Sequence, residues 1–155
     1  MKLYFLRHGQ ANWEQWEQPD DERPLTKKGR KEVEVVASAL KKLQVRPQEI
    51  LSSPLPRALE TAEIVAEKLD MEVVTTPLLA PGFGLHSLRQ LLSEHPDCDL
   101  MFVGHEPDFS FALEQITGGT VRMVKAGLAR VDMENAAEQR GELVWLIPPK
   151  VLKEI

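Results

Sequence analysis

The sequence predicts a single α/β domain spanning residues 1–155, a three-layer α/β/α sandwich with a mostly parallel sheet and a closing hairpin. Apolar runs of strand length alternate with stretches in which apolar residues recur every three or four positions, the order expected of repeated strand–helix units. Near the carboxyl end, two apolar runs flank a short polar segment, which indicates an antiparallel pair. A chain of 155 residues can build one core but is too short for two ordinary domains.

The amino-acid composition excludes several classes of protein. Hydrophobic residues make up 43% of the chain and charged residues 28%, as in ordinary globular proteins. The net charge of −5 argues against a nucleic-acid binder, which needs a basic face to neutralise phosphates. A single cysteine, Cys98, excludes an intramolecular disulfide and suits a reducing compartment. No apolar run has the length of a membrane span, and the N-terminus lacks signal-peptide features. We therefore expect a cytoplasmic protein without nucleic-acid or membrane partners.

The first predicted strand is the apolar run 3–6, which is followed directly by Arg7, His8 and Gly9. In open α/β sheets, ligands bind in the crevice outside the carboxyl ends of the strands. A lone histidine beside an arginine is more often a surface residue, so a catalytic role depends on what other elements bring to the same edge.

The segment from Gln10 to Leu25 shows no clear period, is acidic and carries Trp13 and Trp16. It is predicted to be a long loop or short helical piece over the site; the alternative is a solvated surface loop whose tryptophans pack onto the domain. Thr26 is a good N-cap for the helix that follows, and Arg46-Pro47 is expected to end that helix. The apolar face of the helix comprises Val33, Val36, Ala37, Leu40 and Leu43.

A second strand is predicted at Glu49–Ser52, and Ser53-Pro54 has the composition of a helix start, with serine as N-cap and proline as first helical residue. Arg57 would then lie in the first turn of this helix, where free backbone N–H groups attract anions. Arginine is unfavourable there for the helix dipole, which suggests that it serves a site; the alternative is an exposed side chain without a role. Thr61 lies four residues on, on the same face.

The remaining elements follow the same alternation. Further strands are predicted at 72–75, 99–103, 127–133 and 143–147, with helices at 85–95 and from Phe109 to the Gly118-Gly119 stop, and with a polar turn at 135–141. The apolar strand 99–103 is expected to be central and covered on both faces. His105 follows that strand directly. His86 and His95 are interpreted as surface or helix-end residues.

Three strand ends thus carry Arg7 with His8, Arg57 and His105, and right-handed parallel connections place these ends at one edge of the sheet. Two arginines and two histidines there suit a doubly charged anion such as a phosphoryl group. A neutral imidazole can attack phosphorus and form a phosphohistidine while the arginines neutralise charge. No cysteine–histidine or carboxylate spacing indicates a metal, and no glycine-rich loop indicates a nucleoside triphosphate, so no metal and no cofactor is expected.

Several motifs together resemble the histidine phosphatase superfamily, also called phosphoglycerate-mutase-like, and its order of motifs along the chain. These motifs are Leu6-Arg7-His8-Gly9, Arg23-Pro24-Leu25-Thr26 with Gly29, Ser52-Ser53-Pro54 with Arg57-Ala58 and Thr61-Ala62, and Val103-Gly104-His105-Glu106-Pro107. The small size and the closing stretch Trp145–Pro149 look most like SixA-type phosphohistidine phosphatases. The resemblance implies a phosphoglycerate-mutase-like fold, His8 as the nucleophile, and Arg7, Arg57 and His105 as phosphoryl-binding residues; Gln10 is added to the phosphate-binding set.

The sequence departs from the family in its acids. Larger members that cleave phosphate esters use a glutamate or aspartate after the third strand as general acid, whereas residues 77–92 contain none. Gln10 also stands where an acid often follows the Arg-His-Gly motif. An alkoxide leaving group needs a proton, but an imidazole already protonated on its other nitrogen leaves phosphorus neutral. The site is therefore biased toward phosphohistidine or other good leaving groups, unless a lid carboxylate substitutes; these carboxylates are Glu14, Glu17, Asp20, Asp21 and Glu22.

Three hypotheses follow. The first is a phosphohistidine phosphatase acting on a phosphorylated partner protein, because the short chain has no large cap over the site. The second is a phosphatase for a small phosphorylated molecule, such as a sugar or nucleotide phosphate ester. The third is a phosphate-binding module without turnover, against which the presence of His8 argues; mutase activity is least favoured.

If His8 attacks as a neutral imidazole, activity should fall as the ring is protonated in acid.

Overall fold

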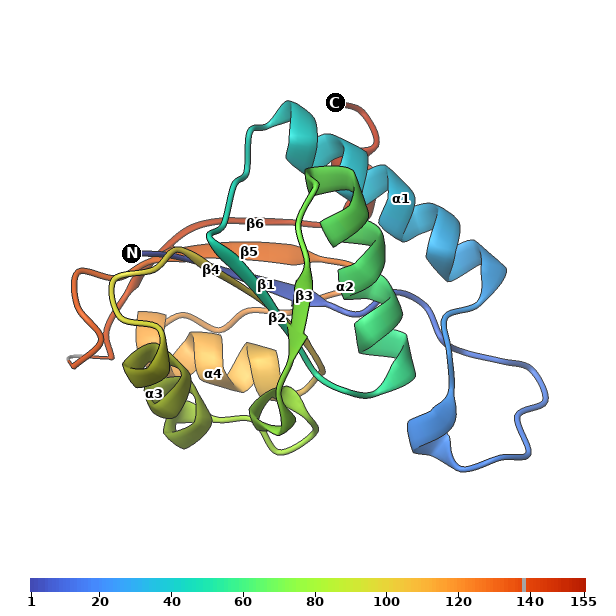
Figure 1. Ribbon diagram of the computed structural model, residues 1–155, viewed down its shortest axis with the longest axis horizontal. Coiled ribbons are helices and arrows are strands. Elements are labelled where there is room, and N and C mark those ends of the chain that lie inside the picture. Colours follow the sequence, from blue (N-terminus) through green and yellow to red (C-terminus); the bar gives the residue numbers. More distant parts are fainter. Residues whose placement is uncertain (138) are drawn as a thin grey trace.

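The computed structural model describes residues 1–137 and 139–155 and shows a six-stranded sheet between two layers of helices (Figure 1). The strands are β1 (Lys2–Arg7), β2 (Glu49–Ser52), β3 (Val73–Thr75), β4 (Leu100–Gly104), β5 (Leu128–Asp132) and β6 (Glu142–Ile147). The helices are α1 (Lys27–Lys42), α2 (Pro56–Leu69), α3 (Leu85–Glu94), α4 (Asp108–Thr117) and α5 (Pro149–Leu152), with 3-10 turns η1 (Asp20–Glu22) and η2 (Pro77–Leu79). The three-layer α/β/α prediction is confirmed.

The strand order explains why one edge of the sheet gathers the site. The order is β3-β2-β4-β1-β5-β6, in which β3, β2, β4 and β1 run parallel and β5 and β6 are antiparallel. All five residues of β4 are buried, as the continuous apolar run predicts. The carboxyl ends of β1, β2 and β4 therefore lie side by side, where three parallel strands end.

Two cores fill the spaces on either side of the sheet. Because side chains alternate along a strand, Tyr4 and Leu6 face α1, α2 and α5, whereas Leu3 and Phe5 face α3 and α4. The first core includes Val33, Val36, Leu40, Ala58, Ala62, Val65 and Leu152, and the second includes Leu88, Leu91, Leu92, Phe109, Leu113 and Ile116. Both layers together hold the strand ends rigidly in place.

Helix α1 begins as the sequence predicts but ends earlier. The Thr26 hydroxyl accepts a hydrogen bond from Gly29 N–H at 3.0 Å, as an N-cap does. The helix stops at Lys42 rather than at Arg46-Pro47, because Gln44 adopts a left-handed φ of 57° and Val45 N–H bonds back to Leu40 O. Leu43, predicted on the apolar face, lies beyond this end of the helix and is 42% exposed.

Helix α2 starts two residues later than the Ser53-Pro54 signal suggests. Leu55 is the N-cap and Pro56 the first helical residue. Ser53 Oγ accepts a hydrogen bond from Leu55 N–H at 3.2 Å, which forms a turn ahead of the helix instead of a cap. Arg57 still lies in the first turn, as predicted.

The closing hairpin is present, since β5 and β6 pair antiparallel as predicted. Its predicted turn, 135–141, includes residue 138, which lies outside the described residues. The short helix α5 was not predicted; it packs Leu152 against the core beside α1. Within the described part of the chain, none of the helices has the length and apolar character needed to cross a membrane.

Candidate active site

The four predicted residues meet at the carboxyl edge of the sheet. Arg7 is the last residue of β1 and His8 follows it, Arg57 lies at the start of α2 after β2, and His105 follows β4. The rings of His8 and His105 face each other with centroids 5.3 Å apart. Both histidines and Arg57 are buried, and the charges of Arg7 and Arg57 act on both rings.

His8 is held by its own backbone and by its ring. Its main-chain N–H donates to Gly104 O at 3.1 Å, and its carbonyl accepts from Ala126 N–H at 3.0 Å, so it is fixed between the end of β4 and the segment that precedes β5. The ring nitrogen Nδ1 lies 2.7 Å from Gly9 O. A carbonyl oxygen can only accept, so Nδ1 carries the hydrogen and the lone pair of the neutral ring is on Nε2. Nε2 is therefore the nucleophilic atom that His8 offers.

Gly9 links this turn to α2. Its N–H donates to Thr61 Oγ1 at 3.1 Å, while the Thr61 hydroxyl donates to Arg57 O at 2.8 Å. The buried Thr61 side chain thus joins the His8 turn to the helix that carries Arg57. The sequence placed Thr61 on the Arg57 face of the helix, but its bond to Gly9 was not predicted.

His105 is tied through the other ring nitrogen. Its Nε2 lies 2.8 Å from Ser53 Oγ, at the end of β2. Its Nδ1 is buried and none of the described residues offers it a hydrogen-bond partner. The sequence carried no sign of the Ser53–His105 contact, because 52 residues separate the two positions.

The arginines also leave buried donors unpaired. Arg7 Nη1 donates to Met123 O at 2.9 Å and Arg57 Nη1 to Asp20 O at 3.2 Å, but the Nε atoms of both are buried without a partner among the described residues. Together with His105 Nδ1, three buried nitrogens without a partner among the described residues belong to this one site. A buried donor without an acceptor costs about 1–3 kcal/mol, so the site is built to receive an oxyanion.

Burial and the neighbouring cations keep both histidines neutral. Burial lowers the pKa of His8 to about 3, with further lowering from His105, Arg57 and Arg7, although the bond to Gly9 O works in the opposite direction. Burial, Arg57 and Arg7 lower the pKa of His105 to about 4. Burial also lowers the pKa of both arginines, yet guanidinium groups stay charged in proteins. The site therefore combines two fixed positive charges with two uncharged imidazoles.

The segment after Gly9 is a lid of irregular backbone, residues 10–24, with η1 as its one helical turn, and it extends away from the sheet beside α2 (Figure 1). Trp13 is 43% exposed and its ring lies 5.9 Å from that of Trp16, so the two tryptophans pack on each other at the surface. Asp20 ties the lid to the site: its carboxylate bonds Arg23 Nε at 2.8 Å and lies 4.0 Å from Arg57 Nη2. This link between the lid and Arg57 was not predicted.

The side chains of the other predicted residues make contacts outside this cluster or are exposed, and the phosphate-binding role of Gln10 stays a prediction. The side-chain oxygen of Gln10 accepts from Thr26 Oγ1 at 2.7 Å, at the start of α1. His86 is exposed, and His95 at the end of α3 lies 2.6 Å from Glu49 Oε2 at the amino edge of the sheet. The remaining lid carboxylates, Glu14, Glu17, Asp21 and Glu22, are exposed.

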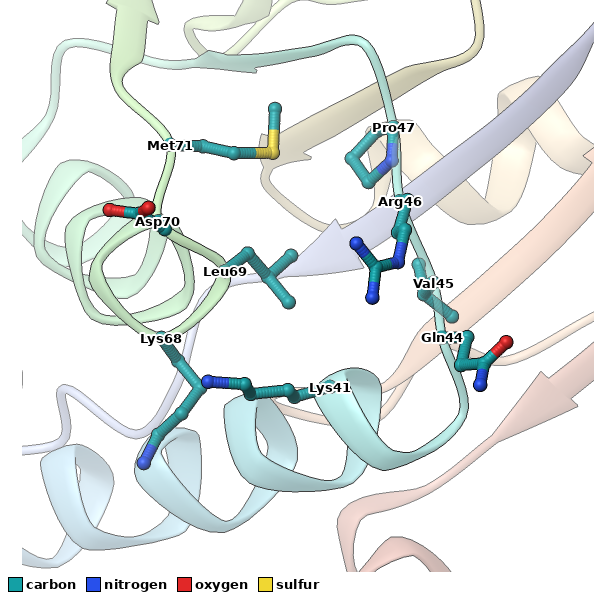
Figure 2. A pocket seen from close by; sticks show the side chains of 9 residues that line it. All are labelled: Lys41, Gln44, Val45, Arg46, Pro47, Lys68, Leu69, Asp70 and Met71. Atoms are coloured by element: carbon teal, nitrogen blue, oxygen red, sulfur yellow. The ribbon is translucent and has the colours of Figure 1, made fainter.

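A separate pocket of about 370 Å³ lies between the carboxyl ends of α1 and α2, away from the histidines (Figure 2). Figure 2 shows Arg46 and Leu69 pointing into it from opposite sides. Its lysines, Lys41 and Lys68, stand in the last turns of the two helices, where cations complement the helix dipole. These charges have a structural explanation, and the pocket contains none of the phosphate-site residues.

Comparison with known proteins agrees with this geometry. An uncharacterised protein of Picosynechococcus sp. is 37% identical over 98% of this chain and 99% of its own length. A solved structure of the protein histidine phosphatase SixA complexed with tungstate superposes with a TM-score of 0.85 at 25% identity, covering 99% of this chain and 100% of that one. A protein named "Probable phosphoglycerate mutase GpmB" from Escherichia fergusonii is 35% identical over 51% of this chain, but this match spans only 37% of the mutase.

The family model for the histidine phosphatase superfamily (branch 1) matches residues 3–84, which hold the Arg-His-Gly turn, the lid and the start of α2. The Picosynechococcus relative and the SixA structure extend the likeness over nearly the whole chain. The chain belongs to the histidine phosphatase superfamily.

Proposed function

We propose that this chain is a phosphatase that carries the phosphoryl group on His8 and that its substrate is phosphohistidine on a partner protein. Family membership and the SixA-like fold support phosphatase activity. One observation supports the finer proposal: a neutral His8 imidazole and three unpaired buried nitrogens lie together at one edge of the sheet, while the loop after β3 contributes no carboxylate.

In the first step, His8 Nε2 attacks phosphorus opposite the leaving group. A P–N bond to His8 forms as the P–N bond to the substrate imidazole breaks. Arg7 and Arg57 neutralise the charge on the equatorial oxygens, and His105 donates a hydrogen bond to one of them.

In the second step, water attacks the phosphohistidine, the P–N bond to His8 breaks and inorganic phosphate is released. Because Nδ1 of His8 keeps its hydrogen on Gly9 O, the ring leaves phosphorus as a neutral imidazole. The same reasoning applies to a substrate histidine whose other nitrogen carries hydrogen. Neither departure needs a general acid.

Two carboxylates whose charges act on the arginines, those of Glu106 and Asp20, make hydrogen bonds to other residues. Glu106, whose charge acts on Arg7, accepts hydrogen bonds from Ser110 N–H at 2.8 Å and from the Ser110 hydroxyl at 2.6 Å. Asp20 is bonded to Arg23. A phosphate ester with a basic alkoxide leaving group would therefore lack an obvious proton donor, which favours phosphohistidine.

Asp20 also supports a second candidate function. Its carboxylate lies 4.0 Å from Arg57 Nη2, within reach of a phosphoryl group bound by that arginine. If the lid shifts, Asp20 could protonate a leaving oxygen, and the chain would then act on small phosphate esters.

The test is turnover of a phosphohistidine-bearing protein, p-nitrophenyl phosphate and ethyl phosphate by the wild type and by His8→Ala. Cleavage of the first two, failure on ethyl phosphate and an inactive His8→Ala are expected. Efficient cleavage of ethyl phosphate would favour the ester phosphatase. Phosphate binding without any turnover would show a binding module and overturn the mechanism.

A further inference from the structure

Ser53 is a fully buried hydroxyl between the start of α2 and His105. Its oxygen lies 3.2 Å from Leu55 N and 2.8 Å from His105 Nε2. The backbone N–H of Leu55 can only donate, so it occupies one lone pair of Ser53 Oγ. The remaining question is the direction of the bond between Ser53 and His105.

The direction follows from a comparison of which buried hydrogens would lack an acceptor in each of the two tautomers of His105. If His105 Nε2 carried the hydrogen, the ring and Leu55 would both donate to Ser53 Oγ, and the serine hydrogen would lack an acceptor among the contacts of the described residues. If the serine donates to Nε2, its hydrogen is used and the hydrogen of the neutral ring lies on Nδ1. Nδ1 is buried and has no hydrogen-bond partner among the described residues, so this hydrogen is available to a bound phosphoryl group.

We propose that Ser53 is a positioning residue: its hydroxyl donates to His105 Nε2 and so holds the ring hydrogen on Nδ1, from which His105 donates to the phosphoryl group. This inference rests on the phosphoryl-binding role proposed for His105. Ser53 acts on the reaction only through the orientation and tautomer of that ring.

The chain offers a matched control in the preceding residue. Ser52 is equally buried, but its hydroxyl donates to Ser53 O at 2.9 Å and does not contact His105. Ser52→Ala and Ser53→Ala each remove one buried hydroxyl from neighbouring positions, so their difference isolates the bond to His105.

The first measurement is the tautomer of His105 in the free wild-type enzyme, from the 15N shifts of its ring nitrogens at neutral pH. Hydrogen on Nδ1 is expected in the wild type and in Ser52→Ala, and a mixture of tautomers in Ser53→Ala. Hydrogen on Nε2 in the wild type would overturn the proposal, whatever the folding of the variants.

The second measurement is function. Ser53→Ala should lower kcat/KM for p-nitrophenyl phosphate about ten- to hundredfold and weaken tungstate binding, while Ser52→Ala should change both by less than about threefold. In a His105→Gln background, Ser53→Ala should have no further effect. Equal losses in the two serine variants, or additive losses with His105→Gln, would refute the positioning role. If Ser53→Ala does not fold, Ser53→Cys is the replacement, with a smaller loss expected because a thiol is a weak donor.

These outcomes are separable from those of the proposed function. If wild type cleaves no phosphohistidine, the substrate proposal fails, yet the tautomer and tungstate measurements still decide the role of Ser53 because neither requires turnover.

Discussion

The turn after β1 and the turn after β4 present the same side chain in opposite ways. His8 and His105 are both buried, and burial lowers the pKa of both rings, to about 3 and about 4. His8 is tied through Nδ1 to the carbonyl of Gly9, which leaves the Nε2 lone pair free. His105 is tied through Nε2 to the Ser53 hydroxyl, which leaves Nδ1–H free when the serine donates as we propose. In the proposed mechanism, the partner of the tied nitrogen, rather than the pKa, makes one ring a nucleophile and the other a donor.

The two turns also differ in how far along the chain their partners lie. His8 finds its carbonyl in the next residue, whereas His105 depends on a serine 52 residues earlier. The contact that fixes the His8 ring is therefore local, whereas the contact that orients His105 depends on the pairing of β2 with β4.

The largest expected effect separates the two roles by truncation. His8→Ala should lower kcat/KM by on the order of 10⁴-fold or more, because no phosphoenzyme can form. His105→Ala should cost about 10²–10³-fold, the loss of one donor to the transition state, and should still form an acid-labile phosphoenzyme. Rapid quenching followed by 31P NMR measures this intermediate. Similar losses of kcat/KM in the two variants, with no phosphoenzyme in either, would contradict the assignment of different roles to His8 and His105.

The second effect is on stability, because both rings are neutral when folded but take up protons when unfolded. Each folded pKa lies below the ordinary 6.5, so the unfolded chain binds more protons as pH falls below 6.5 and stability is lost in that direction. Between pH 7 and pH 5, each ring should lower the free energy of unfolding by about 2 kcal/mol.

Urea unfolding of the wild type, His8→Asn and His105→Gln at these two pH values measures this loss. Each variant should lose about 2 kcal/mol less than the wild type. A loss unchanged by both substitutions would show that the rings are protonated in the folded state.

The lowered pKa of His8 also affects the pH dependence of activity. The fall in kcat/KM in acid that the sequence predicts is expected near pH 3 rather than near pH 6.5.

The contrast between the turns explains what sequence reasoning could reach. The Arg7-His8 turn, the central strand β4 and the meeting of strand ends follow from apolar runs and from parallel connectivity, both of which are readable along the chain. Ser53 was interpreted as a helix cap because serine before proline is a local capping signal. In the structure its hydroxyl serves His105, a tertiary contact that no local pattern encodes.

The observed end of helix α1 and the contact between the lid and Arg57 were not predicted, because no local pattern in the sequence encodes them. Helix α1 ends through a left-handed Gln44, a position that glycine normally marks. The contact between Asp20 and Arg57 depends on how the lid folds back, and the acidic composition of the lid indicates no particular partner.

A third prediction tests how firmly the His8 turn is held. Thr61→Ala removes the acceptor of Gly9 N–H and should lower the free energy of unfolding by about 1–3 kcal/mol and kcat/KM by about tenfold. Thr61→Ser should restore most of both, because the hydroxyl remains. Thr117→Ala is the control, since Thr117 makes the same bond to a carbonyl four residues earlier, in α4. An equally large loss of kcat/KM in Thr117→Ala would show that the effect of Thr61→Ala does not depend on the His8 turn.

The smallest effect concerns the lid. The Asp20 side chain is 71% exposed, and exposed ion pairs contribute about 0–1 kcal/mol, so Asp20→Asn should leave stability nearly unchanged. In the proposed mechanism the Asp20 carboxylate competes with the phosphoryl group for Arg57, so the KM for p-nitrophenyl phosphate should fall about two- to threefold at unchanged kcat. Glu17→Gln, an exposed lid carboxylate, serves as the control. A higher KM would show that Asp20 orients Arg57 for the phosphoryl group, and selective loss of ethyl phosphate cleavage would identify Asp20 as the proton donor of an ester phosphatase.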